Sequence, residues 1–157
     1  MINIGLIGAG RIAGHHIEAI KKFKLFKIVA ICDLHLSKIE NHKITKKVNC
    51  YNHYEVMLKN EKKIDLVVIM TPSGMHYEHA KKIINKYKKN IIIEKPICLK
   101  TTQVEDLYKL AKKNKVKIFP VFQNRYNKAI QFLKKKKTMN ALGKIRTISV
   151  QVRWCRP

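Results

Sequence analysis

Short apolar runs alternate with stretches of helical spacing along the first 122 residues. Between the runs, apolar residues recur every three or four positions, as at Ala13, Ile17 and Ile20, which is typical of an amphipathic helix. Continuously apolar strands separated by helices predict a parallel sheet covered on both faces, and so an α/β protein. The six predicted strands are Ile2–Ile7, Lys27–Cys32, Val48–Tyr51, Ile64–Met70, Asn90–Ile93 and Lys117–Phe122.

A proline in the sixth run bears on the order of the strands. The doubly wound Rossmann arrangement, with strand order 3-2-1-4-5-6, places the sixth strand at an edge of the sheet. Pro120 lies in that strand, and an edge tolerates a residue that cannot donate to the ladder. Two helix starts are also predicted: Ser37 is expected to cap a short helix, and Thr102 with Glu105 forms the pattern of a capping box.

The turn after the first strand has the sequence Gly8-Ala9-Gly10-Arg11-Ile12-Ala13, a G-x-G-x-x-A motif. In a dinucleotide site the first glycine permits the tight turn, the second lets the backbone approach a pyrophosphate, and a small third residue lets the helix pack on the strand. The N–H groups that open the helix then face the phosphates. The alternative is a plain turn between a strand and a helix.

An acid follows the second strand. Asp33 lies 23 residues after Gly10 (33 minus 10), where a carboxylate can accept hydrogen bonds from the adenosine ribose hydroxyls and would repel a 2′-phosphate. No arginine follows it closely. The sequence therefore predicts NAD as the cofactor, in preference to NADP.

Polar residues follow the fourth strand, in the stretch Thr71–Ala80. The carboxyl edge of an open α/β sheet binds ligands, so Thr71 and Pro72 are expected to line the cofactor site. His76 and His79 share one helix face at i and i+3. A metal site needs more ligands than these, so no metal is predicted, and a helix-start or surface role is expected for both.

A charged pair ends the fifth strand, in the stretch Asn90–Ile97. A lysine half-buried at this edge can have a lowered pKa and serve as an acid–base group. Lys95 is thus a candidate catalytic residue. The alternative is an ordinary ion pair between Glu94 and Lys95 at the strand end.

The composition changes the functional prediction only in part. The net charge of +24 suggests nucleic acid, but only five of the 34 basic residues are arginine, the residue of bidentate base and phosphate contacts. No specific nucleic acid partner is predicted, and the run Lys134–Lys137 is expected to be a solvated helix end. Four cysteines without metal-type spacing indicate reduced thiols in a cytoplasmic protein, and no apolar run is long enough for a membrane span.

The GAGRIA turn, Asp33, the TPSGMH segment and the EKP triplet, in this order, resemble the Gfo/Idh/MocA oxidoreductases. The resemblance implies a Rossmann domain, here residues 1–123, followed by a second α/β domain, of which 124–157 would be a linker helix and the first strand, Lys144–Trp154. It implies a catalytic role for Lys95 near the substrate hydroxyl, Glu94 at the nicotinamide ribose, and a cis peptide before Pro96.

The resemblance also completes the set of expected site residues. The segment Phe122–Asn127 is similar to the family's approach to nicotinamide and substrate, so Gln123 is expected at the cofactor and Asn124 and Arg125 at the substrate, with Lys95. The expected cofactor-binding residues are Gly8, Gly10, Arg11, Ile12, Asp33, Thr71, Pro72, His76, Glu94, Lys95 and Gln123.

The function implied is NAD-dependent oxidation of a hydroxyl on a sugar, cyclitol or nucleotide sugar. The tail ending in Arg153-Trp154-Cys155-Arg156-Pro157 is similar to members acting on nucleotide-linked amino sugars, the UDP-N-acetylglucosaminuronate 3-dehydrogenases. Too few residues follow the Rossmann part for a whole second domain. A truncated enzyme, poorly active alone and with oligomer contacts in the missing domain, is therefore expected. A non-catalytic dinucleotide-binding module is the alternative.

Overall fold

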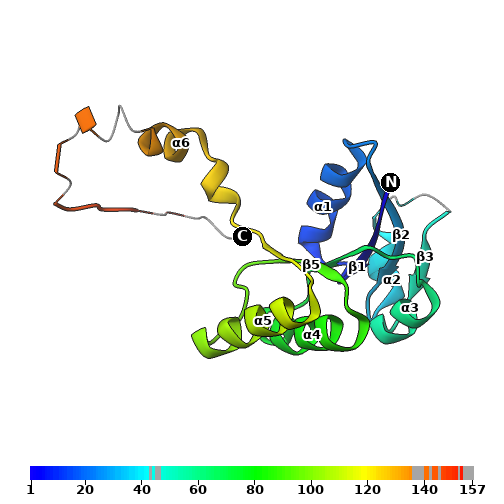
Figure 1. Cartoon of the computed structure of the whole chain (residues 1–157). Helices are drawn as coiled ribbons and strands as arrows, with labels where there is room; N and C mark the ends of the chain where they lie inside the picture. The colour runs from blue at the N-terminus through cyan, green and yellow to red at the C-terminus, as the bar shows by residue number, and fades with distance from the viewer. Residues whose placement is uncertain are drawn as a thin grey trace. The chain divides into compact units, whose positions relative to one another are not determined.

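A computed structural model of the chain describes residues 1–157 apart from 43, 45, 46, 136–139, 142, 145, 152 and 154–157. The chain divides into two compact units, Met1–Val121 and Phe122–Pro157. The first unit holds all six strands of a single parallel sheet (Figure 1). The strands are β1 (Ile2–Ile7), β2 (Phe26–Cys32), β3 (Asn49–Tyr51), β4 (Leu66–Ile69), β5 (Asn90–Ile93) and β6 (Ile118–Pro120).

The strand order is β3-β2-β1-β4-β5-β6, which confirms the predicted Rossmann topology. Strand β6 pairs only with β5, and Pro120 lies opposite Ile93 at the end of that pairing. The edge position predicted from the proline is therefore correct. The order reverses between β1 and β4, and this switch point is where open α/β sheets bind ligands.

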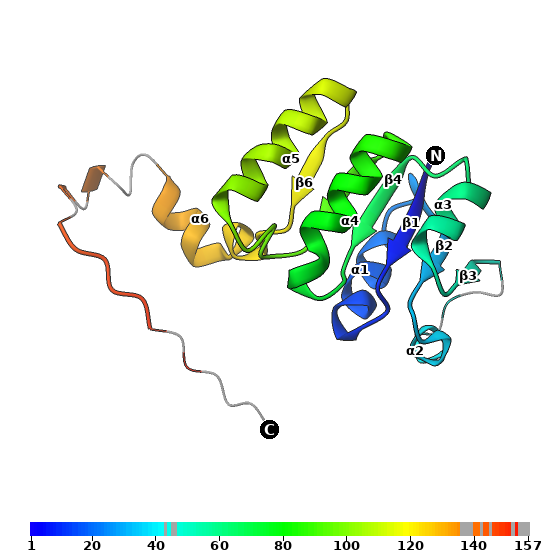
Figure 2. The ribbon, with the colours of Figure 1, turned by 90° about the horizontal axis from the view of Figure 1, so that it is seen from below.

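Helices cover the sheet on both faces, in agreement with the buried character of its strands (Figures 1 and 2). One core cluster joins the sheet to α1 and α2, through residues such as Ala13, Ile17 and Ile39. The other joins it to α3, α4 and α5, through Met57, Ile83 and others. The helices of this unit are α1 (Arg11–Lys21), α2 (Leu36–Glu40), α3 (Tyr54–Asn60), α4 (His76–Lys82) and α5 (Thr101–Asn114), with a 3-10 turn at Ser73–Met75 and a π turn at Ile83–Tyr87.

Strands β1 and β2 are not in uniform register. Ile4 pairs with Ile28 but Gly5 pairs with Ala30, so Val29 is an extra residue on the β2 side. Beyond this irregularity the pairing continues to Ile7 opposite Cys32. The carboxyl ends of β1 and β2 are therefore level with each other at Ile7 and Cys32.

Both predicted capping residues are wrong. Helix α2 begins at Leu36, and its N-cap His35 donates its backbone N–H to Asp33 Oδ1 at 2.9 Å, so a carboxylate upstream of Ser37 organises the turn. Helix α5 begins at Thr101 after an extended N-cap at Lys100, so Thr102 already lies inside the helix. In both cases the chain turns before the residue that carries the capping pattern.

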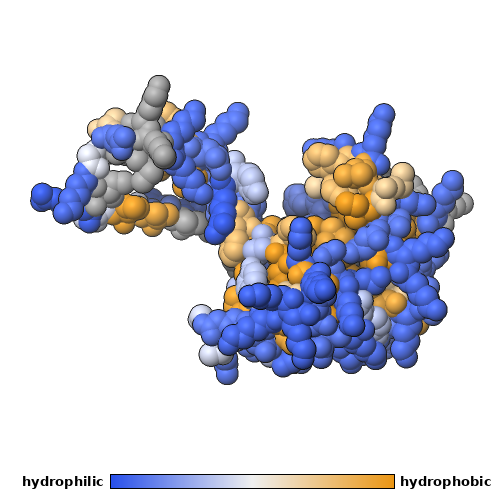
Figure 3. Space-filling model, in the orientation of Figure 1, coloured by the Kyte–Doolittle hydropathy of each residue, from blue (hydrophilic) through white to orange (hydrophobic). Residues whose placement is uncertain are grey.

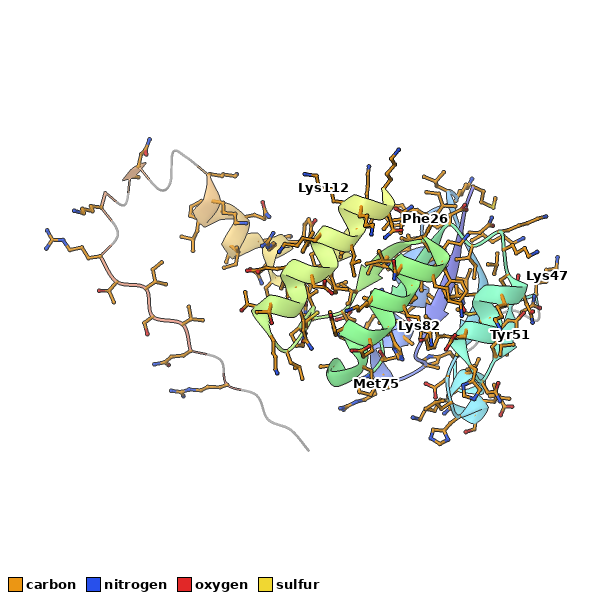
Figure 4. All side chains as sticks on the ribbon, turned by 60° about the horizontal axis from the view of Figure 1, so that its bottom comes forward. Phe26, Lys47, Tyr51, Met75, Lys82 and Lys112 are labelled. Atoms are coloured by element: carbon orange, nitrogen blue, oxygen red, sulfur yellow. The ribbon has the colours of Figure 1, made fainter. Side chains whose placement is uncertain are left out.

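Lysines gather at the carboxyl ends of helices. Lys112 and Lys113 lie in the last turn of α5, and Lys88 ends the π turn that continues α4, with φ 51°. Figure 4 shows Lys112 at the far end of α5 and Met75 at the opposite end of the neighbouring α4. Cations at a helix carboxyl end interact favourably with its dipole, so part of the lysine surplus serves the helices.

Hydrophilic residues cover the visible surface of α4 and α5, and apolar residues show between these helices and α1 (Figure 3). Phe119 on the edge strand β6 contributes to the exposed apolar surface, since its side chain is 47% exposed. The helices α1 and α2 therefore leave part of the sheet on their side uncovered.

The second unit contains the 3-10 turn Gln123–Tyr126 and helix α6 (Lys128–Lys134), which Asn127 caps through its side-chain oxygen. Lys134 ends α6, while Lys136 and Lys137 lie outside the described residues. The described part of Lys144–Trp154 contains no strand, contrary to the expectation, and Ile148 and Val150 are exposed. A strand needs a neighbour to satisfy its backbone hydrogen bonds, and no described residue pairs with this stretch.

Candidate functional site

The glycine-rich turn joins β1 to α1 and has two distinct glycines. Gly8 has φ +97°, and a Cβ there would lie 2.7 Å from the Met70 carbonyl oxygen. Gly10, the N-cap of α1, has an extended backbone, and a Cβ there would meet nothing within 4 Å. Gly8 is therefore required by the fold, whereas Gly10 opens onto free space. This difference between the two glycines is typical of a dinucleotide-binding turn, in which a ligand approaches the backbone at the second glycine.

The Asp33 carboxylate holds this turn in place. Its Oδ2 accepts the N–H of Ala9 at 2.8 Å and its Oδ1 accepts the N–H of His35 at 2.9 Å. A carboxylate has further acceptor sites beyond these two, so Asp33 can also receive ribose hydroxyls. Lys38 Nζ lies 4.0 Å from Oδ1. Asp33 therefore has a cationic neighbour, although no arginine follows it closely in the sequence.

A cavity of about 710 Å³ follows the carboxyl edge of the sheet from Asp33 to the start of α4. Its lining also includes side chains that the motifs did not indicate, among them His35, His53 and His79. The predicted cofactor residues on its wall are Gly8, Gly10, Arg11, Ile12, Asp33, Thr71 and Pro72. A smaller cavity of about 230 Å³ shares Ile12, Thr71 and Pro72 with it and adds His76, Glu94 and Lys95. The two cavities therefore form a continuous trough across the switch point.

The end of β5 differs from both interpretations of the Glu94-Lys95 pair. Glu94 is buried, whereas Lys95 is exposed rather than half-buried. Strand β5 ends at Ile93, and in the bend that follows it the Glu94 side chain lies inside the protein while Lys95 is in contact with solvent. Glu94 Oε1 lies 2.7 Å from His16 Nε2, and Oε2 accepts the backbone N–H of Lys95 at 3.1 Å. The ion partner of Glu94 is His16, not Lys95.

His76 lies under the trough and is buried, so the surface role expected for it is wrong. It does begin α4, as predicted. Its Nδ1 lies 2.7 Å from the Pro96 carbonyl oxygen and its Nε2 lies 2.8 Å from the Thr71 carbonyl oxygen. The ring links the loop after β4 to the Lys95-Pro96 peptide, which is cis as the resemblance implied.

His79 is also buried, and it lies beside the larger cavity. Its Nδ1 is 3.1 Å from Thr71 Oγ1, and its ring lies against that of Tyr54. Burial, together with the nearby His76, holds the pKa of His79 below its usual value. His79 is therefore neutral at neutral pH and fixes the Thr71 hydroxyl. Within the described ranges, no three His, Cys, Asp or Glu side chains are grouped as a metal site would need.

The thiol nearest the trough is unreactive. Burial, with the Asp33 carboxylate beside it, raises the pKa of Cys32 to about 12, so the group stays protonated. Cys32, Cys50 and Cys98 are all free, which confirms the reduced thiols expected for these three. Cys155 lies outside the described residues.

The remaining predicted site residues belong to the second unit. Gln123, Asn124 and Arg125 form its opening 3-10 turn and are exposed. The Arg125 guanidinium lies over the Phe122 ring, 5.0 Å from its centre. Their roles at the cofactor and the substrate stay predictions.

Comparison with known proteins gives a consistent result. The family model described as an oxidoreductase family with an NAD-binding Rossmann fold, GFO_IDH_MocA, matches residues 2–122. Glucose-6-phosphate 3-dehydrogenase of Bacillus subtilis is 26% identical over 150 residues, which are 96% of this chain and 42% of that protein. No described helix has the length and apolar character needed to cross a membrane.

Solved structures show the same fold. The WlbA dehydrogenase of Bordetella pertussis, solved in complex with NADH and UDP-GlcNAcA, superposes with a TM-score of 0.81 at 28% identity, over 90% of this chain and 43% of its own. The D-galactose-1-dehydrogenase of Rhizobium etli gives a TM-score of 0.72 at 32% identity, over 83% of this chain and 40% of its own. The present chain thus spans about two-fifths of the length of such relatives.

Proposed function

Because the chain belongs to the Gfo/Idh/MocA oxidoreductase family with its NAD-binding Rossmann fold, we propose that it binds NAD in the trough and acts in the oxidation of a sugar, cyclitol or nucleotide-sugar hydroxyl. The observation that carries the proposal is the contrast between the two glycines. Gly8 shapes the turn, while Gly10 leaves open space at the start of α1. Asp33, Thr71 and Pro72 complete a cavity of a size suited to a nucleotide.

Different residues along the trough have different roles in the proposed reaction. The N–H groups at the start of α1 bind the pyrophosphate, and Asp33 accepts the adenosine ribose hydroxyls. NAD, when bound, supplies the hydride acceptor. Glu94 offers a fixed, buried carboxylate at the far end of the trough, where a ribose hydroxyl can donate to it. Lys95, as the neutral amine, takes the proton of the substrate hydroxyl and so becomes an ammonium, and its exposed side chain can reach that hydroxyl.

The substrate class follows from the relatives. Those named above act on glucose 6-phosphate or D-galactose, or bind UDP-GlcNAcA. A hydroxyl-bearing ring is common to all of them, and this supports a sugar or nucleotide sugar as the substrate. Neither of the two cavities described above is lined by a residue of the second unit. We therefore expect little sugar oxidation by this 157-residue chain alone, because substrate positioning supplies up to about 7–11 kcal/mol of the barrier reduction.

Titration of the chain with NADH, followed by the fluorescence of the nicotinamide, tests the cofactor proposal directly. Saturable binding is expected. Turnover with NAD and a panel of sugars and nucleotide sugars is then compared between this chain and the product of the complete reading frame that contains it. Binding without turnover in both proteins would favour the non-catalytic dinucleotide-binding module instead. Absence of binding would contradict both functions.

Replacement of Asp33 by alanine is expected to weaken NAD binding at least about tenfold and to lessen the discrimination against NADP, because both a ribose acceptor and a repelling charge are lost. Affinities for NADH and NADPH measured in parallel check this. Asp65→Ala is a matched control, since Asp65 also accepts a backbone N–H at 2.8 Å, from Asn3, but lies before β4 at the opposite end of the strands. Equal affinity of the unchanged chain for the two cofactors would contradict the assignment.

A further inference from the structure

We infer that His16 is the positioning residue that fixes Glu94 for the nicotinamide half of the cofactor, an inference that rests on the proposed function. Neither the glycine motif nor the EKP triplet includes His16. It lies in the second turn of α1, and its Nε2 is 2.7 Å from Glu94 Oε1 across 78 residues of sequence. The side chains of His16 and Glu94 are 17% and 9% exposed. The contact is therefore a largely buried one between the phosphate-binding helix and the end of β5.

A buried carboxylate requires a partner, because removal from water penalises its charge. The neighbouring Lys95 does not meet this need, since its side chain points outward and only its backbone N–H reaches Glu94. Among the described residues, His16 is the one side chain recorded in contact with the Glu94 carboxylate. The histidine thus accounts for the inward position of the carboxylate.

The two contacts of Glu94 restrict its orientation from both sides. Oε1 is held by His16 and Oε2 by the Lys95 N–H, while the carboxylate lines the smaller cavity. A carboxylate with both oxygens engaged in this way keeps acceptor sites for a ligand but cannot rotate freely. Without His16 the carboxylate can turn away from the cavity or take up a proton, and either change weakens its acceptance of a hydroxyl.

The same contact does not involve the adenosine end of the trough. The larger cavity, which contains Asp33, is lined by neither His16 nor Glu94. Loss of His16 should therefore affect a ligand that extends to the smaller cavity and spare one that ends before it. NADH and ADP form such a pair of ligands, because ADP ends at the pyrophosphate and lacks the ribose whose hydroxyls Glu94 would accept.

The test compares both ligands on four proteins by calorimetry or fluorescence. His16→Leu is expected to weaken NADH binding about tenfold or more, the loss typical of a hydrogen bond to a charged group, and to change ADP binding less than twofold. His16→Gln retains a donor near the Nε2 position and is expected to restore most of the NADH affinity. His15→Leu is the matched control, since His15 is the adjacent, exposed residue of the same helix, and it should bind both ligands as the unchanged chain does.

The outcomes separate this inference from the proposed function. If the unchanged chain binds neither ligand, the proposed function fails. If it binds both but His16→Leu lowers the two affinities equally, or lowers neither, His16 has only a structural role and the inference is overturned. Should His16→Leu not fold, ring NMR signals of His16 in the unchanged chain give the answer: they should shift with NADH and not with ADP. Equal shifts with both ligands would overturn the inference.

Discussion

Replacing Gly8 with alanine is expected to lower the free energy of unfolding by about 3 kcal/mol, because two penalties coincide there. The backbone at Gly8 has φ +97°, which L residues rarely adopt, and the added methyl would lie 2.7 Å from the Met70 carbonyl oxygen. That oxygen belongs to the backbone at the end of the central strand β4, so it cannot move aside as a flexible side chain would. Urea denaturation followed by circular dichroism measures the loss.

Gly10→Ala provides the matched control two residues away. Its backbone is extended and a methyl there meets no protein atom within 4 Å, so stability should change by less than about 0.5 kcal/mol. NADH binding should nevertheless fall by about tenfold or more, because the methyl occupies the space through which the pyrophosphate reaches the N–H groups. The two variants thus distinguish the effect of this turn on stability from its effect on NADH binding. A stable Gly8→Ala protein, or full NADH affinity in Gly10→Ala, would contradict this view of the turn.

Lys95→Met should reduce the turnover number of the complete protein by about 10²–10⁴, the usual contribution of general acid–base catalysis. Methionine keeps much of the side-chain length and removes the ammonium. Because Lys95 is exposed and makes its recorded contact to Glu94 through the backbone, NADH binding and stability should change little. Steady-state kinetics with a substrate found in the sugar panel, together with NADH titration, check the two halves of this expectation.

Lys100→Met is the control for the change in charge. Lys100 is an exposed lysine five residues farther along the chain, at the N-cap of α5, and it lines neither cavity. The turnover number of this variant should match that of the unchanged protein. Unaltered turnover in Lys95→Met would remove Lys95 from the mechanism, while equal losses in both variants would indicate a general electrostatic effect.

The fold could be predicted from the sequence because its signals are local and redundant. Each strand is a short apolar run, each crossover has helical spacing, and Pro120 agreed with the edge position that the doubly wound order gave to the sixth strand, which the sheet then showed. The glycine turn and Asp33 were equally accessible, since their spacing is dictated by one βαβ unit. The caps at Ser37 and Thr102 failed because a capping pattern says which residue can cap, not where the chain turns into the helix.

The contacts that complete the site could not be predicted in this way. His16 and Glu94 are 78 positions apart, and only the sheet order brings their elements together. His42 donates to the Ala9 carbonyl at 2.9 Å from a loop with no motif. The burial of Glu94 and the exposure of Lys95 depend on which way the chain turns after β5, and no local pattern encodes that direction. Two adjacent histidines in the first helix were visible, but nothing in the sequence distinguished the half-buried His16 from the exposed His15.

The position of Asp33 depends on the length of strand β2 after the extra residue Val29. Side chains alternate across a strand with a period of two, so a one-residue deletion between Ala30 and Asp33 that kept Val29 as an extra residue would send the carboxylate to the other face of the sheet. Its acceptor atoms would then leave both the Ala9 N–H and the cavity. Substitutions inside β2 lack this effect, because they leave the number of residues in the strand unchanged. The pairing from Gly5 opposite Ala30 onward is then preserved. Insertions and deletions in this strand are thus more informative than side-chain differences when chains of this family are compared for cofactor use.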